Sequence, residues 1–305
     1  MAEVCCIGGM TLDRTLKLDE SAVMASSNPA TMRTAPGGVA RNVAENLARL
    51  SVATSLFSQV GDDEHGREAV AATARAGVDV SQVQAHPSLP TGSYTAIVQP
   101  DGQLLVGAAD LGACEAMDAD WLDTLWPSIS AARIVFADAN LAPGVLEQLI
   151  KRTRGTDVEL AINLVSVAKA RRLPPDLTAI DLLFCNLDEA RAVTGGAGDA
   201  GEAAAALGEL VVGAAIVTAG ADGAWLAGAG QTRHVPAPAS DVVDVSGAGD
   251  ALVAGFLFGR LRGHDALDAC RLGVAAAAVT TASHERTTCL NAEQLLASLP
   301  VRRVS

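Results

Sequence analysis

The 305-residue sequence has few basic residues, few aromatic residues and no long apolar run. Lys and Arg together number 22 against 35 Asp and Glu, which gives a formal net charge of −13. A chain this acidic is a poor partner for nucleic-acid polymers or anionic membrane surfaces. A small anionic ligand stays possible, because a few backbone amides can bind an anion whatever the global charge.

Membrane and secretion signals are also missing. No apolar run approaches the roughly 20 residues of a membrane span. The N-terminus, MAEVCCIGGMTLD, has an acid where a signal peptide needs basic residues and a long apolar core. We therefore expect a cytoplasmic enzyme or binding protein. The cysteines lack C-x-x-C spacing, which favours reduced core residues over a metal or disulfide role: Cys5, Cys6, Cys114, Cys185, Cys270 and Cys289.

Short β-branched runs alternate with alanine-rich helical patterns along most of the chain. Strands are predicted at 4–7, 54–60, 133–138, 158–162, 181–185 and 214–218. Helices are predicted at 38–50, 66–76, 118–126, 142–154, 187–194 and 199–211, and then at 247–262, 264–282 and 291–299. This alternation predicts an α/β fold built from crossover units on a parallel sheet.

Two segments break the alternation. Residues 10–36 are irregular and polar, and residues 91–110 predict a hairpin with a turn at Pro100-Asp101-Gly102. We expect both to form a small β-rich lid over the sheet edge where the strands end, which is where open α/β sheets bind ligands. Because no linker or repeat divides the chain, residues 1–305 are predicted to form a single domain with this lid as an insertion.

Several common site motifs are absent or misplaced. The stretch GAGDAG at 196–201 matches the dinucleotide pattern G-x-G-x-x-G, but it follows a predicted helix rather than a strand, so a helix-to-helix loop is predicted instead. The sequence contains no Walker A loop, no G-x-S-x-G and no H-E-x-x-H. These observations disfavour the simplest dinucleotide, hydrolase and zinc-protease interpretations.

Asp250 lies where the segment VVDVSGAGD passes from a β-branched run through two glycines into a helix. The first-turn amides and positive dipole end of that helix predict an anion pocket at Gly247, Ala248 and Gly249. Asp250 could simply complement the helix dipole. Alternatively, it accepts a proton from a hydroxyl that attacks a phosphoryl group held by the amides.

A second glycine pair opens the helix of PGGVARNVAENL, with Gly37, Gly38 and Asn42 at its N-terminal mouth. Paired glycines let a small ligand touch backbone, and an Asn one turn later can both donate to and accept from sugar hydroxyls. A tight strand-to-helix turn would use the same residues, so a purely structural role stays open.

These motifs resemble the ribokinase-type (PfkB) carbohydrate and nucleoside kinases. GGVARN, NLDE at 186–189, VTAGADGAW at 217–225 and DVSGAGD occur in the order of that family and span nearly the whole chain. The resemblance implies a three-layer α/β/α sandwich with a β-sheet lid and phosphoryl transfer from ATP with Mg²⁺. Within the family the sequence is most similar to pseudouridine kinases, on SNP at 27–29, GSY at 92–94, ADAN at 137–140 and LVS at 164–166 followed by Lys169.

The resemblance implies phosphorylation of the 5′-hydroxyl of pseudouridine, with other sugar or nucleoside kinases (ribokinase or adenosine kinase type) and a non-catalytic nucleoside sensor as alternatives. It makes Asp250 the base, beside the amides of Gly247, Ala248 and Gly249. It assigns the substrate to Asp13, Gly38, Asn42, Ser27, Asn28, Tyr94, Asn140 and Lys169. It assigns ATP to Asn186, Thr218, Gly220, Gly223 and Gly249, with Mg²⁺ arranged by Asn186 and Glu189 and K⁺ held by Asp244.

Some of these residues have simpler explanations. The N-x-x-E at 186–189 could be a helix cap, Asp13 could cap its own loop, and Tyr94 could belong to the lid core. Asn163 stands where pseudouridine kinases usually have Asp followed by Pro, and Ser246 stands where the family commonly has Thr. Because lid strands in this family often pair between subunits, the resemblance also implies a homodimer.

Overall fold

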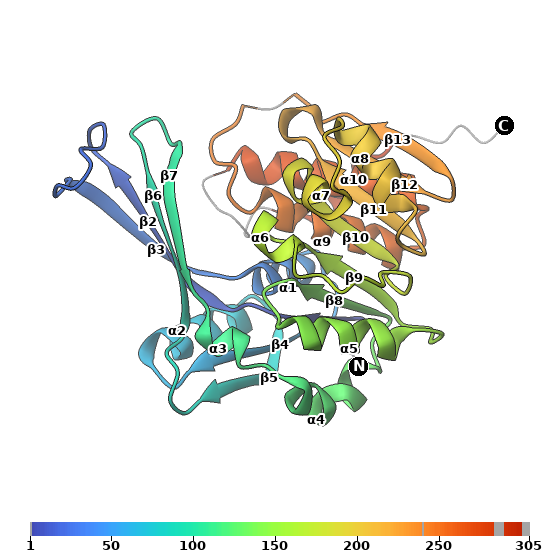
Figure 1. Cartoon of the computed structure of the whole chain (residues 1–305), viewed down its shortest axis with the longest axis horizontal. Coiled ribbons are helices and arrows are strands. Elements are labelled where there is room, and N and C mark those ends of the chain that lie inside the picture. Colours follow the sequence, from blue (N-terminus) through green and yellow to red (C-terminus); the bar gives the residue numbers. More distant parts are fainter. Residues whose placement is uncertain (1, 240, 284–289, 301–305) are drawn as a thin grey trace.

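Two β-sheets of different size organise the chain (Figure 1). The computed structural model describes residues 2–239, 241–283 and 290–300. Within these residues the larger sheet has nine strands, in the order β13-β12-β11-β10-β9-β8-β1-β4-β5. Its strands are β1 (Val4–Ile7), β4 (Thr54–Gly61), β5 (Asp79–His86), β8 (Ile134–Asp138), β9 (Glu159–Asn163), β10 (Leu182–Asn186), β11 (Ala214–Thr218), β12 (Ala224–Gly228) and β13 (Gln231–Val235).

Neighbouring strands from β5 to β11 are parallel, whereas β12 and β13 add an antiparallel hairpin beyond β11. The parallel strands therefore all end at one edge of the sheet, which carries Asp138, Asn163, Asn186 and Thr218 as their last residues. This edge is the predicted place for a ligand in an open α/β sheet.

Helices cover both faces of the large sheet. Alternate residues of β1 pack into different cores, Val4 and Cys6 on one face and Cys5 and Ile7 on the other. The first core includes α1 (Val39–Arg49), α2 (Glu64–Arg75), α9 (Ala248–Leu261), α10 (Ala266–Thr281) and α11 (Ala292–Ala297). The second includes α3 (Gly112–Glu115), α4 (Ala119–Ile129), α5 (Pro143–Thr153), α6 (Val167–Ala170), α7 (Leu187–Thr194) and α8 (Ala200–Gly208).

The smaller sheet is the predicted lid. It has the order β3-β2-β6-β7 and projects away from the body of the molecule (Figure 1). Its strands are β2 (Thr11–Leu18), β3 (Ala30–Gly37), β6 (Gly92–Val98) and β7 (Leu104–Asp110). Every residue of the edge strand β7 is exposed, including Leu104, Leu105 and Val106.

The structure confirms the predicted α/β alternation and adds strands that the sequence pattern missed. β5, DVSQVQAH, and β13, QTRHV, lie at the two edges of the large sheet and carry too many polar residues to show an apolar pattern. Residues 196–199 of the GAGDAG stretch lie between α7 and α8, as predicted, and its last two residues begin α8.

Five of the cysteines are free and buried, and Cys289 lies outside the described residues. None of the helices that the structure describes is long and apolar enough to span a membrane.

Candidate active site

The N-terminus of α9, called its mouth below, carries the glycines of the predicted anion pocket. Gly247 is its N-cap in the left-handed region, with φ of 78°, which glycine adopts without the strain a side chain would bring. No side chain among the described residues caps the helix. A Cβ on Gly249 would meet no described atom within 4 Å, so the helix opens onto space at this point. The amide of Ala248 donates to the carbonyl of Val245 at 3.3 Å, a bond that an anion binding there would replace.

The two glycine motifs meet at Asp250. This residue is the third of α9 and is 9% exposed. Asn42 Nδ2, from the first turn of α1, donates to Asp250 Oδ2 at 2.8 Å. The buried Arg41, which the sequence analysis left without a role, donates to Asn42 Oδ1 at 2.9 Å and pairs with Glu45. These contacts orient the Asn42 amide so that its nitrogen faces the carboxylate of Asp250.

The N-terminus of α1 needs its glycines for close approach. Gly38 has φ of 99°, and a Cβ there would lie 2.2 Å from the carbonyl oxygen of Gly9. A Cβ on Gly37 would lie 2.1 Å from Asp13 Oδ1, so the missing side chain makes room for that carboxylate. Asp13 also accepts from Thr11 Oγ1 at 2.9 Å. The structure thus places Asp13 against the glycine pair that opens the helix of Asn42.

Tyr94 belongs to the lid. It lies directly opposite Asp13 in the parallel pairing of β2 with β6, so the two side chains share a face. A Cβ on Gly107 of β7 would lie 2.4 Å from the Tyr94 hydroxyl, which shows that the ring lies across the neighbouring strand. The structure therefore gives Tyr94 a lid-packing role on the same face as Asp13.

Asn140 and Lys169 are brought together, with Lys169 Nζ donating to Asn140 Oδ1. A Cβ on Gly9 would lie 3.1 Å from Asn140 Nδ2, so this pair lies beside the turn that leads into β2 and Asp13. Burial lowers the pKa of Lys169, while the negative charge of Asp138 opposes that shift.

Ser27 and Asn28 are not brought to this place. They lie in the loop between β2 and β3, at the free end of the lid (Figure 1). Ser27 is exposed. Asn28 accepts from the Val23 amide at 2.8 Å and donates to the carbonyls of Val23 and Ser26 at 3.0 and 3.1 Å. The Asn28 amide is therefore engaged in holding its own loop.

Asn186 and Glu189 form a complete capping box on α7. Asn186 Oδ1 accepts from the Glu189 amide at 2.9 Å, and Glu189 accepts from the Asn186 amide and Nδ2, both at 3.0 Å. Burial raises the pKa of Glu189. The motif therefore does form the helix cap named as its alternative role, and a role toward Mg²⁺ stays a prediction.

The predicted nucleotide residues lie along the same sheet edge. Thr218, the last residue of β11, is paired with Asn186, and its hydroxyl donates to the Cys185 carbonyl at 3.4 Å. Gly223 has φ of 92°, and a Cβ there would lie 2.2 Å from the carbonyl oxygen of Val235, whereas Gly220, with φ of 58°, has open space around it. Gly223 therefore serves the fold, and Gly220 borders open space.

Asn163 is the last residue of β9, and Asp244 lies in the segment between β13 and α9. Asp244, ahead of α9, accepts from the Ser246 amide at 2.8 Å. Asn163, in place of the usual Asp, accepts from the Val165 amide at 2.8 Å. Val165 has φ of 65°, an unusual conformation for a β-branched residue, and the Asn163 side chain supports the turn that contains it.

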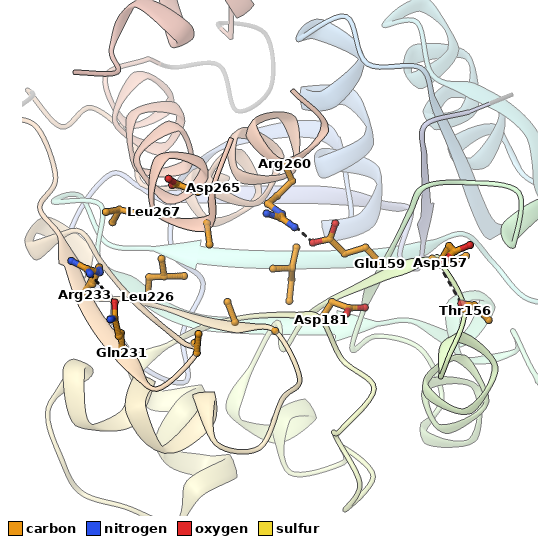
Figure 2. Close-up of a pocket in the computed structure, with 17 residues that line it drawn as sticks. Thr156, Asp157, Glu159, Asp181, Leu226, Gln231, Arg233, Arg260, Asp265 and Leu267 are labelled. Carbon is orange, nitrogen blue, oxygen red and sulfur yellow. Dashed lines mark hydrogen bonds and ion pairs between the residues drawn. The ribbon is translucent and has the colours of Figure 1, made fainter. Parts of the chain in front are cut away.

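A cavity of about 750 Å³ lies at the opposite edge of the sheet, among the first residues of β9, β10 and β11 (Figure 2). Asp181 and Glu159 line it, and Arg260 of α9 donates to Glu159 at 3.2 Å. None of the predicted site residues lines this cavity. The predicted residues are instead distributed along the carboxyl edge and the lid.

Comparisons with known proteins identify the family and the fold. A family model described as pfkB family carbohydrate kinase matches residues 1–293. Pseudouridine kinase of Escherichia coli (strain K12) is 30% identical over 257 residues, covering 83% of this chain and 82% of that protein. The structure of a carbohydrate kinase from Agrobacterium tumefaciens has 31% identity and a TM-score of 0.83, covering 98% of this chain and 97% of that one. Arabidopsis thaliana ribokinase, solved with ribose and ATP, has 22% identity and a TM-score of 0.82, covering 97% and 98%.

These comparisons confirm the predicted ribokinase-like fold, a large mixed sheet flanked by helices with a smaller second sheet. They also support the enzyme class, a nucleotide-dependent phosphotransferase with an alcohol acceptor on a small sugar or nucleoside. The chain belongs to the pfkB family of carbohydrate kinases.

Proposed function

We propose that the protein transfers the γ-phosphoryl group of ATP to the 5′-hydroxyl of pseudouridine, giving pseudouridine 5′-phosphate and ADP. The observation that carries this proposal is the hydrogen bond from Asn42 to Asp250. It joins the mouth of α1, suited to sugar hydroxyls, to the mouth of α9, suited to phosphate. The likeness to pseudouridine kinase of Escherichia coli supports the choice of acceptor.

The proposed reaction uses this geometry as follows. The 5′-oxygen attacks the γ-phosphorus, a new O–P bond forms, and the bond to the β,γ-bridging oxygen breaks so that ADP leaves with the electron pair. The proton of the attacking hydroxyl passes to the carboxylate of Asp250. The first-turn amides of α9 face the charge that builds on the transferring oxygens. Asn42 holds the Asp250 carboxylate in place during the transfer.

The residues assigned to Mg²⁺ fit an indirect role. Both carboxylate oxygens of Glu189 accept from Asn186, and Glu189 is buried, so direct coordination would break the cap of α7. Mg²⁺ usually keeps several waters and is held by phosphate oxygens with one or two carboxylates. When bound, Mg²⁺ would neutralise phosphate charge, while Asn186 and Glu189 order its waters. Asp244, beside the mouth of α9, would help to hold K⁺.

The acceptor side of the site suits a ribose better than a base. Asp13 and Asn42 lie at the mouth of α1, where vicinal hydroxyls could bond to both. The uracil is assigned to Asn140 and Lys169, with Tyr94 on the lid above. Because Asn28 is engaged in its own loop, a ribokinase-type acceptor is the second candidate. A sensor without turnover is a third, which the intact Asp250 disfavours.

The lid also supports the proposal of a homodimer. β7 is an edge strand whose residues Leu104, Leu105 and Val106 are 58%, 40% and 51% exposed. An exposed apolar edge strand is a template for pairing with another strand, and a second lid would cover it. Sedimentation at several protein concentrations tests this part separately.

The test of function is ADP release from Mg-ATP with K⁺, measured with pseudouridine, uridine, adenosine, ribose and fructose 6-phosphate. Selective turnover of pseudouridine is the expected result. Turnover of ribose or adenosine instead would keep Asp250 and the α9 mouth but discard the acceptor. Binding of a nucleoside without ADP release from any compound would favour the sensor.

A further inference from the structure

Asp138 is a buried carboxylate that the sequence analysis did not assign. It is the last residue of β8 and is 0% exposed. Its Oδ2 accepts from the backbone amides of Gly9 at 3.0 Å and Ala40 at 2.9 Å, and its Oδ1 accepts from the amide of Asn140 at 3.0 Å. We call these four residues the Asp138 cluster.

The three amides come from three segments that are far apart in the sequence. Gly9 lies in the turn between β1 and β2, Ala40 in the first turn of α1, and Asn140 in the loop between β8 and α5. The amide of Arg41 also donates to the Gly9 carbonyl at 3.3 Å, which adds a second bond between the turn and α1. One side chain therefore fixes the turn, the helix and the loop relative to one another.

Each of these segments carries an acceptor-binding residue of the proposed function. The turn at Gly9 leads into β2 and Asp13, and Ala40 lies two residues before Asn42, which contacts Asp250. Asn140 itself accepts from Lys169. The hydrogen bonds that Asp138 accepts come from backbone amides, so it acts on these side chains through the segments that carry them.

Packing alone does not explain a charge at this position. None of the ion pairs in the described part of the chain includes Asp138. Burying a carboxylate is unfavourable unless hydrogen bonds and nearby positive charge compensate it. Here the compensation comes from three amides, the positive end of α1 and the charge of Lys169. A side chain at position 8 would collide with Asp138, because a Cβ on Gly8 would lie 2.5 Å from Asp138 Cγ.

We propose that Asp138 is the positioning residue of the acceptor site, holding Asp13, Asn42 and Asn140 in the one arrangement that presents the acceptor hydroxyl to Asp250. The proposal rests on the acceptor site assigned under the proposed function. It implies that Asp138 affects how the acceptor is bound and oriented, and that it has no part in binding ATP.

The test substitutes Asp138→Asn, which keeps the shape of the side chain. An amide retains one accepting oxygen but turns an NH₂ group toward at least one backbone N–H, so the cluster cannot be satisfied as a whole. We expect kcat/KM for the acceptor to fall about 10- to 100-fold, because small misplacement of a reacting group costs rate on that scale. KM for ATP and the slow hydrolysis of ATP without acceptor should stay within twofold.

Asp181→Asn is the matched control. Its carboxylate also accepts from a backbone amide, that of Leu160 at 2.7 Å, but at the opposite edge of the sheet (Figure 2). This variant should leave both acceptor and ATP parameters within twofold. An unchanged acceptor kcat/KM in Asp138→Asn, or a parallel loss toward ATP, would overturn the proposal.

Hydrogen–deuterium exchange separates this proposal from the choice of acceptor. In folded Asp138→Asn, peptides containing Gly9, Ala40 and Asn140 should exchange faster together, whichever compound of the panel is turned over and even if none is. Faster exchange in only one of them would refute the cluster. If the variant does not fold, hydrogen–deuterium exchange in the unsubstituted protein tests the proposal instead. Each compound of the panel is added in turn, and a compound that binds should slow exchange in all three peptides together. An ATP analogue alone should not, and absence of any slowing would overturn the proposal.

Discussion

Replacing Asp250 by Asn removes the proposed base and should change little else in the structure. The side chain is 9% exposed and accepts a hydrogen bond from Asn42 Nδ2 at 2.8 Å. An Asn can accept the same bond through its carbonyl oxygen, so the contact between α1 and α9 should survive in weaker form. Replacing this charge-assisted bond by a neutral one costs about 1 kcal/mol of unfolding free energy. For a chain of this size we expect the thermal midpoint to shift by about 3 °C or less.

The catalytic effect should be much larger than the structural one. General-base catalysis contributes about 10²- to 10⁴-fold, and an amide cannot accept the proton. We therefore expect kcat to fall by at least about 10²-fold, while the Kd for ATP measured by calorimetry changes less than threefold. The assay is ADP release at saturating Mg-ATP and acceptor.

Asp268→Asn provides a matched control for this experiment. Asp268 is also the third residue of its helix, α10, is 5% exposed, and bonds to Arg271 at 2.7 Å. Both acids interact with a helix dipole in the same way, but only Asp250 faces the glycine-lined mouth. Asp268→Asn should keep kcat within twofold. If Asp250→Asn retained more than a tenth of the kcat, Asp250 would be a dipole-complementing residue and not the base.

Three further substitutions test single elements of the site. Gly38→Ala forces a Cβ to within 2.2 Å of the Gly9 carbonyl at a φ of 99°, so the unfolding free energy in urea should fall by roughly 1–3 kcal/mol, and an unchanged value would contradict the strain. Gly249→Ala meets no described atom, so urea unfolding should show equal or higher stability while kcat falls. Burial raises the pKa of Glu189 above the ordinary value of about 4.5, so the wild-type protein loses stability as the pH rises from 4.5 through that raised pKa. Glu189→Gln should lack this pH-dependent component in thermal midpoints measured from about pH 4.5 to 8.

Much of the fold and part of the site could be predicted because they depend on local rules. Apolar periodicity located the central strands and the long helices, and glycine with first-turn amides located the mouths of α1 and α9. The rule that parallel strands share a carboxyl edge also predicted where a ligand would lie. It did not predict that the two mouths meet, because the bond from Asn42 to Asp250 joins residues 208 positions apart.

The rest could not be predicted because it depends on contacts that leave no local pattern. Asp138 accepts from amides 98 and 129 positions away, and any backbone N–H could have served. Arg41 resembles an ordinary surface residue of an amphipathic helix until the fold buries it against Glu45. The assignment of Asn28 to the substrate came from the family resemblance, which carries no information on whether its amide is already engaged.

The glycines of the two mouths differ in what excludes a side chain from them. At Gly37 and Gly38 the protein itself fills the space, with the Asp13 carboxylate and the Gly9 carbonyl where a Cβ would be. Close packing in the folded protein is therefore enough to explain glycine at these two positions. Gly249 has no such neighbour among the described residues, and alanine would suit the first turn of a helix better than glycine. The described part of the fold therefore gives no reason for glycine at 249, whereas the proposed anion site gives one, because a ligand bound there approaches the backbone closely.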